Sequence, residues 1–156
     1  MFEIVEACKN DLDEVRAAFR EYARWLGVNL AFQGDFEQEL AKLPGAYAPP
    51  AGRLLVARSD AGLAGTVALR PLGEAICEMK RLFVREAYRR HGLGRQLVNR
   101  ILDEARRIGY QRMRLDTLAH MTEAVTLYKS AGFQLIPAYY HNPLPDVVYL
   151  ELNLAT

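Results

Sequence analysis

The sequence predicts an α/β fold of the α+β type, in which helices cover both faces of a mixed sheet of roughly six to seven strands. The first observation is the order of the expected elements, which runs β-α-α-β-β-β-α-β-α-β-β. The second is a stretch with helical period, residues 93–108, between two strand-like segments, 75–84 and 112–118. A helix that crosses over between two strands makes them parallel, so the sheet is expected to be mixed. A length of 156 residues with 51% apolar residues favours a single domain, residues 1–156.

The N-terminal elements follow from alternation and from helical spacing. Residues 2–7 alternate between apolar and polar positions, which predicts a strand. The next apolar side chains recur at intervals of three and four, which makes one buried stripe on a helix that Gly27 ends. Asp35 is expected to cap a short second helix, which Pro44 stops. The stripe of the first helix comprises Leu12, Val15, Phe19, Tyr22 and Leu26.

The rest of the chain alternates between strand and helix signals. Residues 53–59 and 63–72 flank a short Gly-containing turn and predict a hairpin. The helical period of residues 93–108 ends at Gly109, a typical helix stop. A further helix is expected over residues 122–132. The remaining expected strands are 75–84, 112–118, 133–140 and 146–154.

Charge and cysteine content exclude several classes of protein. The net charge of +1 provides no global field toward nucleic acid or a membrane, so neither is expected as a partner. The arginines are nevertheless crowded into residues 81–114, so an anion site should be local. Cys8 and Cys77 are far apart and lack metal-ligand spacing, which indicates a reducing cytosol and a cytoplasmic protein. The N-terminal residues carry acids and no long apolar run, so we expect no signal peptide.

The segment "RRHGLGRQL" places two glycines and three arginines where a strand gives way to a helix. The N-terminus of a helix exposes unpaired N–H groups and a partial positive charge, which suits a pyrophosphate. A P-loop needs Gly-Lys-Ser/Thr, but residues 94–96 are Gly-Arg-Gln, and a dinucleotide fingerprint needs a third glycine where Leu97 stands. A third pattern, Arg/Gln-x-x-Gly-x-Gly/Ala, is met by Arg89, Gly92 and Gly94.

Two longer blocks separate these alternatives. "EMKRLFVREAYRRHGLGRQLVNRILDEARRIGY" is followed by "LDT" and then by "EAVTLYKSAGF", and together they cover residues 78–133. In this order the blocks resemble the GCN5-related N-acetyltransferase (GNAT) family. The resemblance implies a sheet whose fourth and fifth strands splay apart, here 75–84 and 112–118, with acetyl-CoA in the gap as acyl donor and no metal.

The resemblance also implies which residues bind the cofactor. The pyrophosphate is expected on the loop before the helix, and the pantetheine arm along the edge of the preceding strand, as a peptide adds to a sheet edge. A free N–H on that edge would also stabilise an oxyanion. Many relatives have an asparagine seven residues before the tyrosine of "LYKSAGF"; here it is Met121, so Thr117 or a backbone group is expected to replace that contact. The expected cofactor residues are Leu82, Phe83, Val84, Arg89, Arg90, His91, Gly92, Leu93, Gly94, Arg95, Thr117 and Tyr128.

Two residues are expected to carry the proton transfers. By resemblance Tyr128 is the general acid for the leaving thiolate, since a phenol with a pKa of about 10 is protonated at neutral pH. Glu78 matches the acidic position on the fourth strand and is the candidate base, with a structural or substrate-holding role as the alternative. Strand alternation would put Glu78, Lys80, Leu82 and Val84 on one face, so that Glu78 could look toward the thioester, whereas a bulge in this strand would shift that phase.

The acceptor is expected between the first two helices and the closing strands. There "FQGDF" and "YYHNPLP" mix aromatic and amide side chains, which suits a small amine such as an amino acid or a polyamine. The expected acceptor residues are Phe32, Gln33, Lys80, Tyr140 and Asn142.

The alternatives are an N-acetyltransferase that acts on peptides or proteins, and a non-catalytic acyl-CoA-binding module. Nucleic-acid binding through residues 81–114 is disfavoured by the interleaved acids Glu86, Asp103 and Glu104. A homodimer is left open.

Overall fold

The computed structural model describes residues 2–27 and 36–155 of the chain. It contains one seven-stranded sheet with the strand order β1-β2-β3-β4-β5-β7-β6. The element order matches the one that the sequence predicts. The bounds are β1 Glu3–Glu6, α1 Leu12–Leu26, α2 Phe36–Lys42, β2 Arg53–Ser59, β3 Gly62–Gly73, β4 Ile76–Val84, α3 Leu93–Ile108, β5 Arg112–Leu118, α4 Thr122–Ser130, β6 Gln134–Ile136 and β7 Val147–Asn153, with short 3-10 turns at Lys9–Asp11, Gly45–Tyr47 and Glu86–Tyr88.

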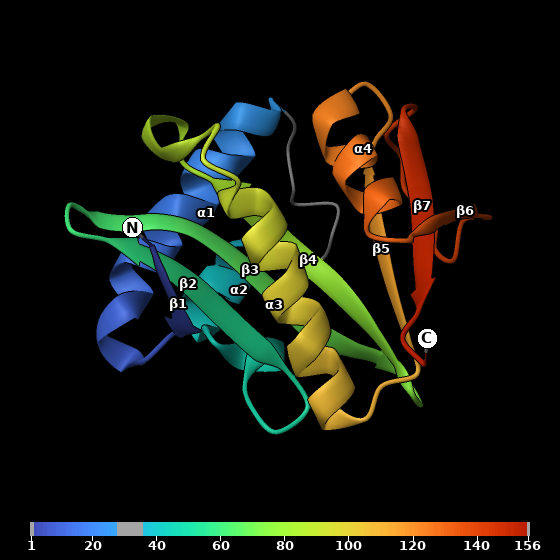
Figure 1. The fold of residues 1–156 in the computed structure, drawn as a ribbon, viewed down its shortest axis with the longest axis horizontal. Coiled ribbons are helices and arrows are strands. Elements are labelled where there is room, and N and C mark those ends of the chain that lie inside the picture. Colours follow the sequence, from blue (N-terminus) through green and yellow to red (C-terminus); the bar gives the residue numbers. More distant parts are fainter. Residues whose placement is uncertain (1, 28–35, 156) are drawn as a thin grey trace.

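The sheet is mixed because one pair of strands is parallel. β4 and β5 are joined through the crossover helix α3 and run parallel, whereas the other strand pairs are antiparallel. The parallel pairing is short: Ile76–Glu78 of β4 pair with Arg112–Arg114 of β5. Beyond it the two strands diverge toward their carboxyl ends (Figure 1). Among the residues that the structure describes, the remainder of β4 therefore has β3 on one edge and no paired strand on the other.

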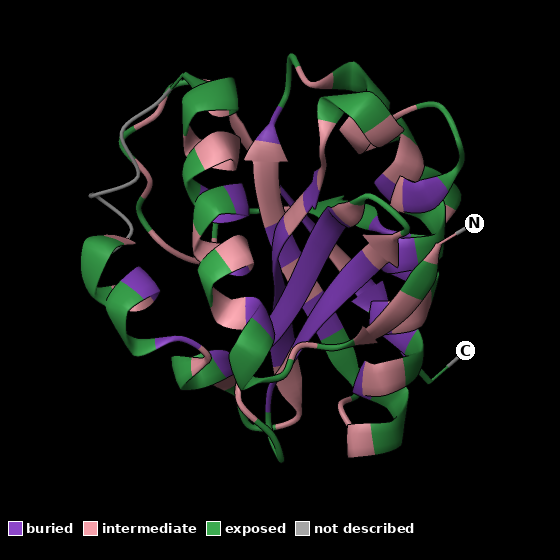
Figure 2. Cartoon of the chain, turned by 90° about the vertical axis from the view of Figure 1, so that its left-hand side faces the viewer, coloured by how far each residue is buried: buried purple, intermediate pink, exposed green. Residues whose placement is uncertain are grey.

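Helices bury apolar side chains on both faces of the sheet, as predicted. α1 and α2 cover one face through a core that includes Val15, Phe19 and Leu40. α3 and α4 cover the other face, where the α3 stripe packs against the centres of β2 to β5. In Figure 2 the central strands are buried while the helices turn exposed faces outward. The buried side chains of α3 are Leu93, Leu97, Val98, Ile101, Leu102 and Ala105.

The expected strand over residues 133–140 is mostly wrong. β6 is confined to Gln134–Ile136 and leaves its partner β7 after the pair Ile136 and Tyr149. Pro137 follows directly, and a proline cannot donate a ladder hydrogen bond. Tyr139 and Tyr140 consequently lie in a segment without regular secondary structure, so their side chains need not point to opposite faces of the sheet.

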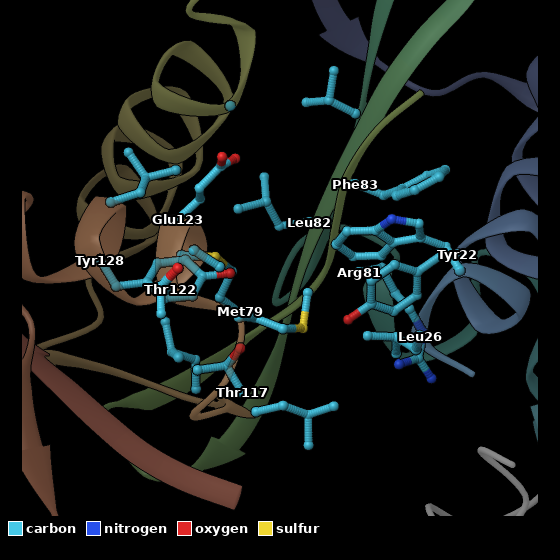
Figure 3. Close-up of a pocket in the computed structure, with 18 of the residues that line it drawn as sticks. Tyr22, Leu26, Met79, Arg81, Leu82, Phe83, Thr117, Thr122, Glu123 and Tyr128 are labelled. Carbon is cyan, nitrogen blue, oxygen red and sulfur yellow. The ribbon is translucent and has the colours of Figure 1, made fainter. Parts of the chain in front are cut away.

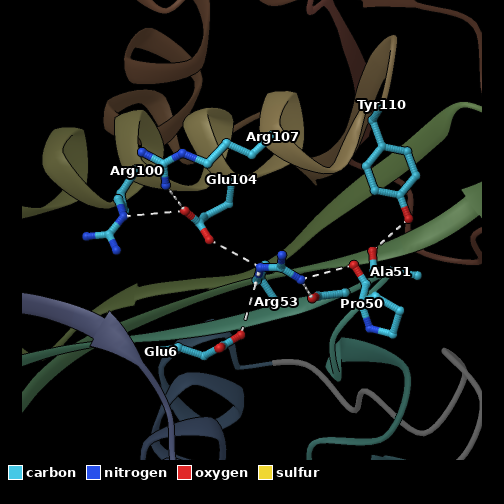
Figure 4. Close-up of polar contacts among 9 residues, drawn as sticks. Glu6, Pro50, Ala51, Arg53, Arg100, Glu104, Arg107 and Tyr110 are labelled. Atoms are coloured by element: carbon cyan, nitrogen blue, oxygen red, sulfur yellow. Dashed lines mark hydrogen bonds and ion pairs between the residues drawn. The ribbon is translucent and has the colours of Figure 1, made fainter.

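Several arginines of the crowded segment have structural roles. Arg53 of β2 approaches Glu104 of α3 to 3.1 Å and Glu6 of β1 to 3.9 Å (Figure 4). Glu104 also pairs with Arg100 and Arg107 of its own helix. This network ties α3 to the edge of the sheet. Arg100 and Arg107, which lie beyond the first turn of α3, are thus used within the fold.

Candidate active site

A cleft of about 900 Å³ opens where β4 and β5 diverge. Its walls come from residues 79–84 of β4 and 115–118 of β5, and α1 and α4 contribute side chains from opposite sides. In Figure 3, Tyr22 and Phe83 lie on one side of the cleft, and Thr122 and Tyr128 on the other. The loop before α3 closes one end, and Asn142 and Leu144 line another part of the wall.

A bulge in β4 sets the direction of the side chains on that wall. Thr66 pairs with Phe83 and Ala68 pairs with Lys80, so β4 contains one residue more than β3 between these two pairs. Arg81 lies in the bulge with a left-handed φ of 59°. The Thr66 hydroxyl donates a 2.8 Å hydrogen bond to the Arg81 carbonyl and so satisfies a backbone group that the bulge displaces.

The bulge makes the expected alternation along β4 wrong. Met79 packs into the core under α3, and so do Leu82 and Val84. Strict alternation would place Met79 on the face opposite to Leu82 and Val84. Phe83 instead contacts the rings of Tyr22 and Trp25 on α1. Glu78 and Lys80 therefore do not share a face with Leu82 and Val84.

The loop before α3 supplies the features that a pyrophosphate requires. Gly92 has a φ of 75° and serves as the N-cap of α3, a left-handed conformation that favours glycine. Gly94 is different, because a Cβ there would meet Leu127 at an ordinary 3.5 Å. Gly94 has no left-handed φ, and a side chain there would not clash with the rest of the protein. The absence of a side chain at this position leaves space at the wall of the cleft. Arg90 and Arg95 are exposed and line the same end.

Arg89 belongs to the wall of the cleft. Its Nε donates a 2.9 Å hydrogen bond to the Val84 carbonyl, and its guanidinium lies 4.9 Å from the centre of the Trp25 ring and 5.7 Å from that of Phe83. This contact holds the end of β4 against α1. His91 does not line the cleft; its ring lies 6.1 Å from that of Phe2.

Tyr128 of α4 is buried beside the cleft. Its ring packs edge to face on Phe133 at 5.9 Å. Within the part of the chain that the structure describes, its hydroxyl makes no hydrogen bond, so the proton on it is not committed to a protein acceptor. Burial raises the pKa of this phenol well above its ordinary value, and the nearby Tyr22 and Asp116 raise it further. The group remains protonated at neutral pH.

Glu78 is 1% exposed and does not line the cleft. Its Oε1 accepts a 2.9 Å hydrogen bond from Arg70 Nε and forms an ion pair with Arg70 Nη2 at 2.8 Å. Its Oε2 accepts a 2.6 Å hydrogen bond from the Tyr139 hydroxyl. Both carboxylate oxygens are therefore engaged by the protein itself.

A second carboxylate, Asp116 of β5, does line the cleft. Its Oδ2 accepts hydrogen bonds from the Tyr140 hydroxyl and, at 3.4 Å, from the Asn142 amide. Lys80 lines the cleft as well; burial and Arg81 lower the pKa of its ammonium, while Glu78 and Asp116 oppose that shift. Asp116 belongs to the "LDT" motif but is not among the site residues that the sequence predicts. The available signal was the one acidic residue of β5, whose other charged residues are Arg112 and Arg114.

The cleft brings together most of the expected cofactor residues. Of the expected acceptor residues, Lys80 and Asn142 line it, Tyr140 reaches Asp116 without lining it, and Phe32 and Gln33 lie outside the described residues. Thr117 and Met121 both line it near α4. The expected cofactor residues on its wall are Leu82, Phe83, Val84, Arg89, Arg90, Gly92, Leu93, Gly94, Arg95, Thr117 and Tyr128.

Residues 2–27 and 36–155 contain no cluster of three or more His, Cys, Asp or Glu side chains that could bind a metal ion. No helix among them has the length and apolar character needed to cross a membrane.

Comparison with known proteins agrees with this geometry. Residues 12–133 match the model of the acetyltransferase (GNAT) family. An uncharacterized N-acetyltransferase of Schizosaccharomyces pombe is 45% identical over 147 residues, which cover 93% of this chain and 90% of that protein. A putative acyl-CoA N-acyltransferase of Klebsiella pneumoniae superposes with a TM-score of 0.77 at 26% identity, covering 99% of this chain and 98% of that one.

A fold neighbour at lower identity carries a ligand. A putative acetyltransferase from Salmonella typhimurium, solved with acetyl-CoA, has a TM-score of 0.76 at 20% identity and covers 99% of this chain and 94% of its own. The α/β fold, the enzyme class and the family that the motifs predict are thus confirmed. Matched over most of its length, the chain belongs to the acetyltransferase (GNAT) family and is an N-acetyltransferase.

Proposed function

We propose that this acetyl-CoA-dependent N-acetyltransferase transfers the acetyl group directly to the primary amine of a small molecule. The observation that carries the proposal is the cleft between β4 and β5, which joins an arginine-lined helix N-terminus to a wall with Tyr128, Lys80 and Asp116. Acetyl-CoA supplies an activated thioester. The protein must bind its phosphates, align its arm and provide groups for proton transfer.

The residues of the cleft fit acetyl-CoA. The first turn of α3 contains no acidic residue, and Arg90 and Arg95 lie beside its exposed N–H groups. Gly94 leaves space at the same place without any need from the protein's own packing. Beyond Glu78, the β4 edge that faces β5 pairs with no strand of the described chain and can pair with the amides of the pantetheine arm. We assign the pyrophosphate to the loop and the arm to this edge.

Tyr128 is the proposed acid. Its hydroxyl is protonated, lies at the cleft and is not bound to another described residue, so it can donate to the leaving thiolate. Glu78 stays the sequence-based candidate for the base. Its burial and its bonds to Arg70 and Tyr139 favour the alternative, a structural role that holds the closing loop against β4.

A small acceptor is favoured by what surrounds the acceptor end. Lys80 of β4, Asp116 of β5 and Asn142 of the loop before β7 bring one cationic, one anionic and one amide group to the same cleft. That combination suits an amine with a second polar group, such as an amino acid. A peptide would need an extended groove past these side chains.

A thiol-release assay tests the proposal. Purified protein, acetyl-CoA and a thiol reagent are combined with amino acids, simple amines, polyamines or peptides with free N-termini. We expect CoA release with at least one small amine, at a rate that exceeds the hydrolysis of acetyl-CoA alone. Release with peptides but with no small amine would support the peptide alternative. Tight binding of acetyl-CoA without release for any acceptor would support a non-catalytic binding module.

A further inference from the structure

We propose that Tyr22 of α1 is a further catalytic residue, whose hydroxyl donates a hydrogen bond to the carbonyl oxygen of the acetyl thioester and stabilises the negative charge that forms there during transfer. The inference rests on the proposed function and concerns the acetyl end of the same cleft. It gives a chemical task to a side chain that the sequence places only in the apolar stripe of a helix.

The Tyr22 hydroxyl has no partner within the described part of the protein. The residue is half-buried and lines the cleft, yet its oxygen makes no hydrogen bond with residues 2–27 or 36–155. Among these residues, Arg85 Nε is the one side-chain atom that is sealed from solvent without a partner, so the Tyr22 oxygen is open to the cleft. In Figure 3 the hydroxyl points toward the space between the two walls. It is therefore available to a ligand.

Packing holds the Tyr22 ring and so fixes the direction of its hydroxyl. The ring centre lies 5.6 Å from that of Phe83 on β4 and 6.4 Å from that of Trp25 on the next turn of α1. Trp25 is fixed in turn by the guanidinium of Arg89, 4.9 Å from its ring centre. A donor that is held by packing can meet a ligand without first breaking a hydrogen bond inside the protein. Such preorganisation is what an oxyanion site requires.

The length of the pantetheine arm brings the thioester to the bulge in β4. A Cβ at Gly94 would lie 4.0 Å from Val84, so the proposed pyrophosphate loop meets β4 at that residue. From pyrophosphate to sulfur the arm has about twelve bonds, the length of about four extended residues or roughly 14 Å. Counted back from Val84 along the edge of β4 that faces β5, the sulfur comes beside Lys80 and Arg81.

The charges around Tyr22 indicate that its hydroxyl lies at the same level. Burial raises the pKa of this phenol, while Arg81 lowers it and Asp116 of β5 raises it, so both charges are within electrostatic range. The hydroxyl stays protonated at neutral pH and can donate. Tyr22 also contributes to raising the pKa of Tyr128, which lies on the opposite wall in Figure 3. The two hydroxyls thus flank the space for a thioester, whose sulfur and carbonyl oxygen project from one carbon in different directions.

Tyr22 keeps its proton throughout the reaction. The lone pair of the neutral acceptor nitrogen forms the bond to the carbonyl carbon, and the carbonyl π pair moves onto the oxygen, where the hydrogen bond from Tyr22 strengthens. The pair then returns, the carbon–sulfur bond breaks with its electrons on sulfur, and sulfur takes the proton of the Tyr128 hydroxyl. The nitrogen releases one proton to water, and Tyr128 regains one from water.

The test observes the carbonyl group itself and needs no acceptor. Protein is saturated with acetyl-CoA that carries ¹³C at the carbonyl carbon, and the NMR resonance of this carbon is compared among the wild type, Tyr22→Phe, Tyr128→Phe and Tyr110→Phe. A hydrogen bond to the oxygen draws electron density from the carbon and moves the resonance downfield. The acetyl-CoA affinity and the thermal midpoint of each variant are measured in parallel, and so are kcat and KM for the best acceptor.

We expect the resonance of acetyl-CoA bound to the wild type to lie downfield of that of free acetyl-CoA, and Tyr22→Phe to move it back toward the free value. Tyr22→Phe should also lower kcat about 100-fold, the loss typical of one donor to an oxyanion. Its thermal midpoint, acetyl-CoA affinity and acceptor KM should stay unchanged. Tyr128→Phe should keep the wild-type resonance, because its hydroxyl meets the sulfur. Tyr110→Phe, whose hydroxyl bonds to Ala51, should match the wild type in every measurement.

The outcomes separate this inference from the proposed function. If Tyr22→Phe keeps the wild-type resonance, the hydrogen bond to the carbonyl does not exist and the inference is overturned, even where small amines release CoA thiol. A wild-type kcat in Tyr22→Phe also overturns it, and a raised acceptor KM alongside would make Tyr22 an acceptor-binding side chain. If the resonance moves as expected and no small amine releases thiol, the contact of Tyr22 with the acetyl group is supported and the proposed function fails.

Discussion

The hydroxyl of Thr66 on β3 donates a 2.8 Å hydrogen bond to the backbone carbonyl of Arg81 on β4. Thr66 is fully buried, and Arg81 has a positive φ at the bulge. The contact therefore joins a β3 side chain to the bulge in β4, beyond which the β4 side chains point to the opposite faces of the sheet. It stabilises the strand along which the pantetheine arm is proposed to lie.

Thr66→Val tests this link. Valine has nearly the same shape but cannot donate, so the Arg81 carbonyl would lose its partner in a buried place. We expect the free energy of unfolding, measured by urea denaturation, to fall by about 1–2 kcal/mol. Thr126→Val, at an exposed position of α4, should change it by less than about 0.5 kcal/mol. Equal effects of the two substitutions would show that the hydrogen bond does not stabilise the bulge.

Tyr128→Phe tests the acid. The hydroxyl makes no hydrogen bond to a described residue, so its removal should leave folding and acetyl-CoA affinity unchanged. We expect kcat to fall about 100-fold, the lower range for the loss of a general acid. Tyr110→Phe removes a hydroxyl that bonds to Ala51 away from the cleft and serves as the matched control. Wild-type kcat in Tyr128→Phe would remove the acid role.

Gly94→Ala tests whether the space over the first turn of α3 is reserved for a ligand. The new Cβ meets Leu127 at 3.5 Å, an ordinary contact, so the variant should fold with unchanged or slightly higher stability. We expect the affinity for CoA to fall about tenfold, because the methyl group displaces a phosphate that lies against the backbone. Gly73→Ala, where a Cβ meets nothing within 4 Å, is the control. Unchanged CoA affinity in Gly94→Ala would place the pyrophosphate elsewhere.

Arg70→Ala tests the structural contribution of the Glu78 pair. The substitution would leave a carboxylate that is 1% exposed with Tyr139 as its hydrogen-bond donor. We expect the free energy of unfolding to fall by about 1–3 kcal/mol, less than for a fully buried pair because the Arg70 side chain is 42% exposed. Arg20→Ala breaks an exposed pair with Glu37 and should cost less than about 1 kcal/mol. Similar losses for both would argue that Glu78 does not need Arg70.

Alkylation of the two cysteines tests the packing of β4. Cys8 is exposed, whereas Cys77 is completely buried and its burial raises the pKa of the thiol to about 12. Because thiolates react and thiols do not, iodoacetamide at pH 8 should add one group to the folded protein, on Cys8, and two after denaturation. Mass spectrometry of the intact chain reads the result. Rapid modification of Cys77 in the folded protein would contradict its burial.

Local patterns in the sequence were sufficient for most of the fold. The bounds of α1, β2, α3 and β5 agree with the apolar periods and with the glycine stops at 27 and 109. These features depend on residues close in sequence, because helical or strand spacing decides which side chains share a face. The motifs around Gly92 and Tyr128 also led to the family and to the wall of the cleft, since the family carries those residues at fixed spacing along one stretch of chain.

The sequence by itself therefore determined the order of the elements, the family and many of the residues that line the cleft at the N-terminus of α3. The tertiary structure alone decided the bulge at Arg81, the burial of Glu78 and the position of Asp116 beside Tyr140 and Asn142. Each of these depends on contacts between segments far apart in the chain. The periodicity of a sequence indicates which face of a helix or strand a residue occupies, but not which distant side chain it contacts. A single extra residue in a strand moves every following side chain to the opposite face.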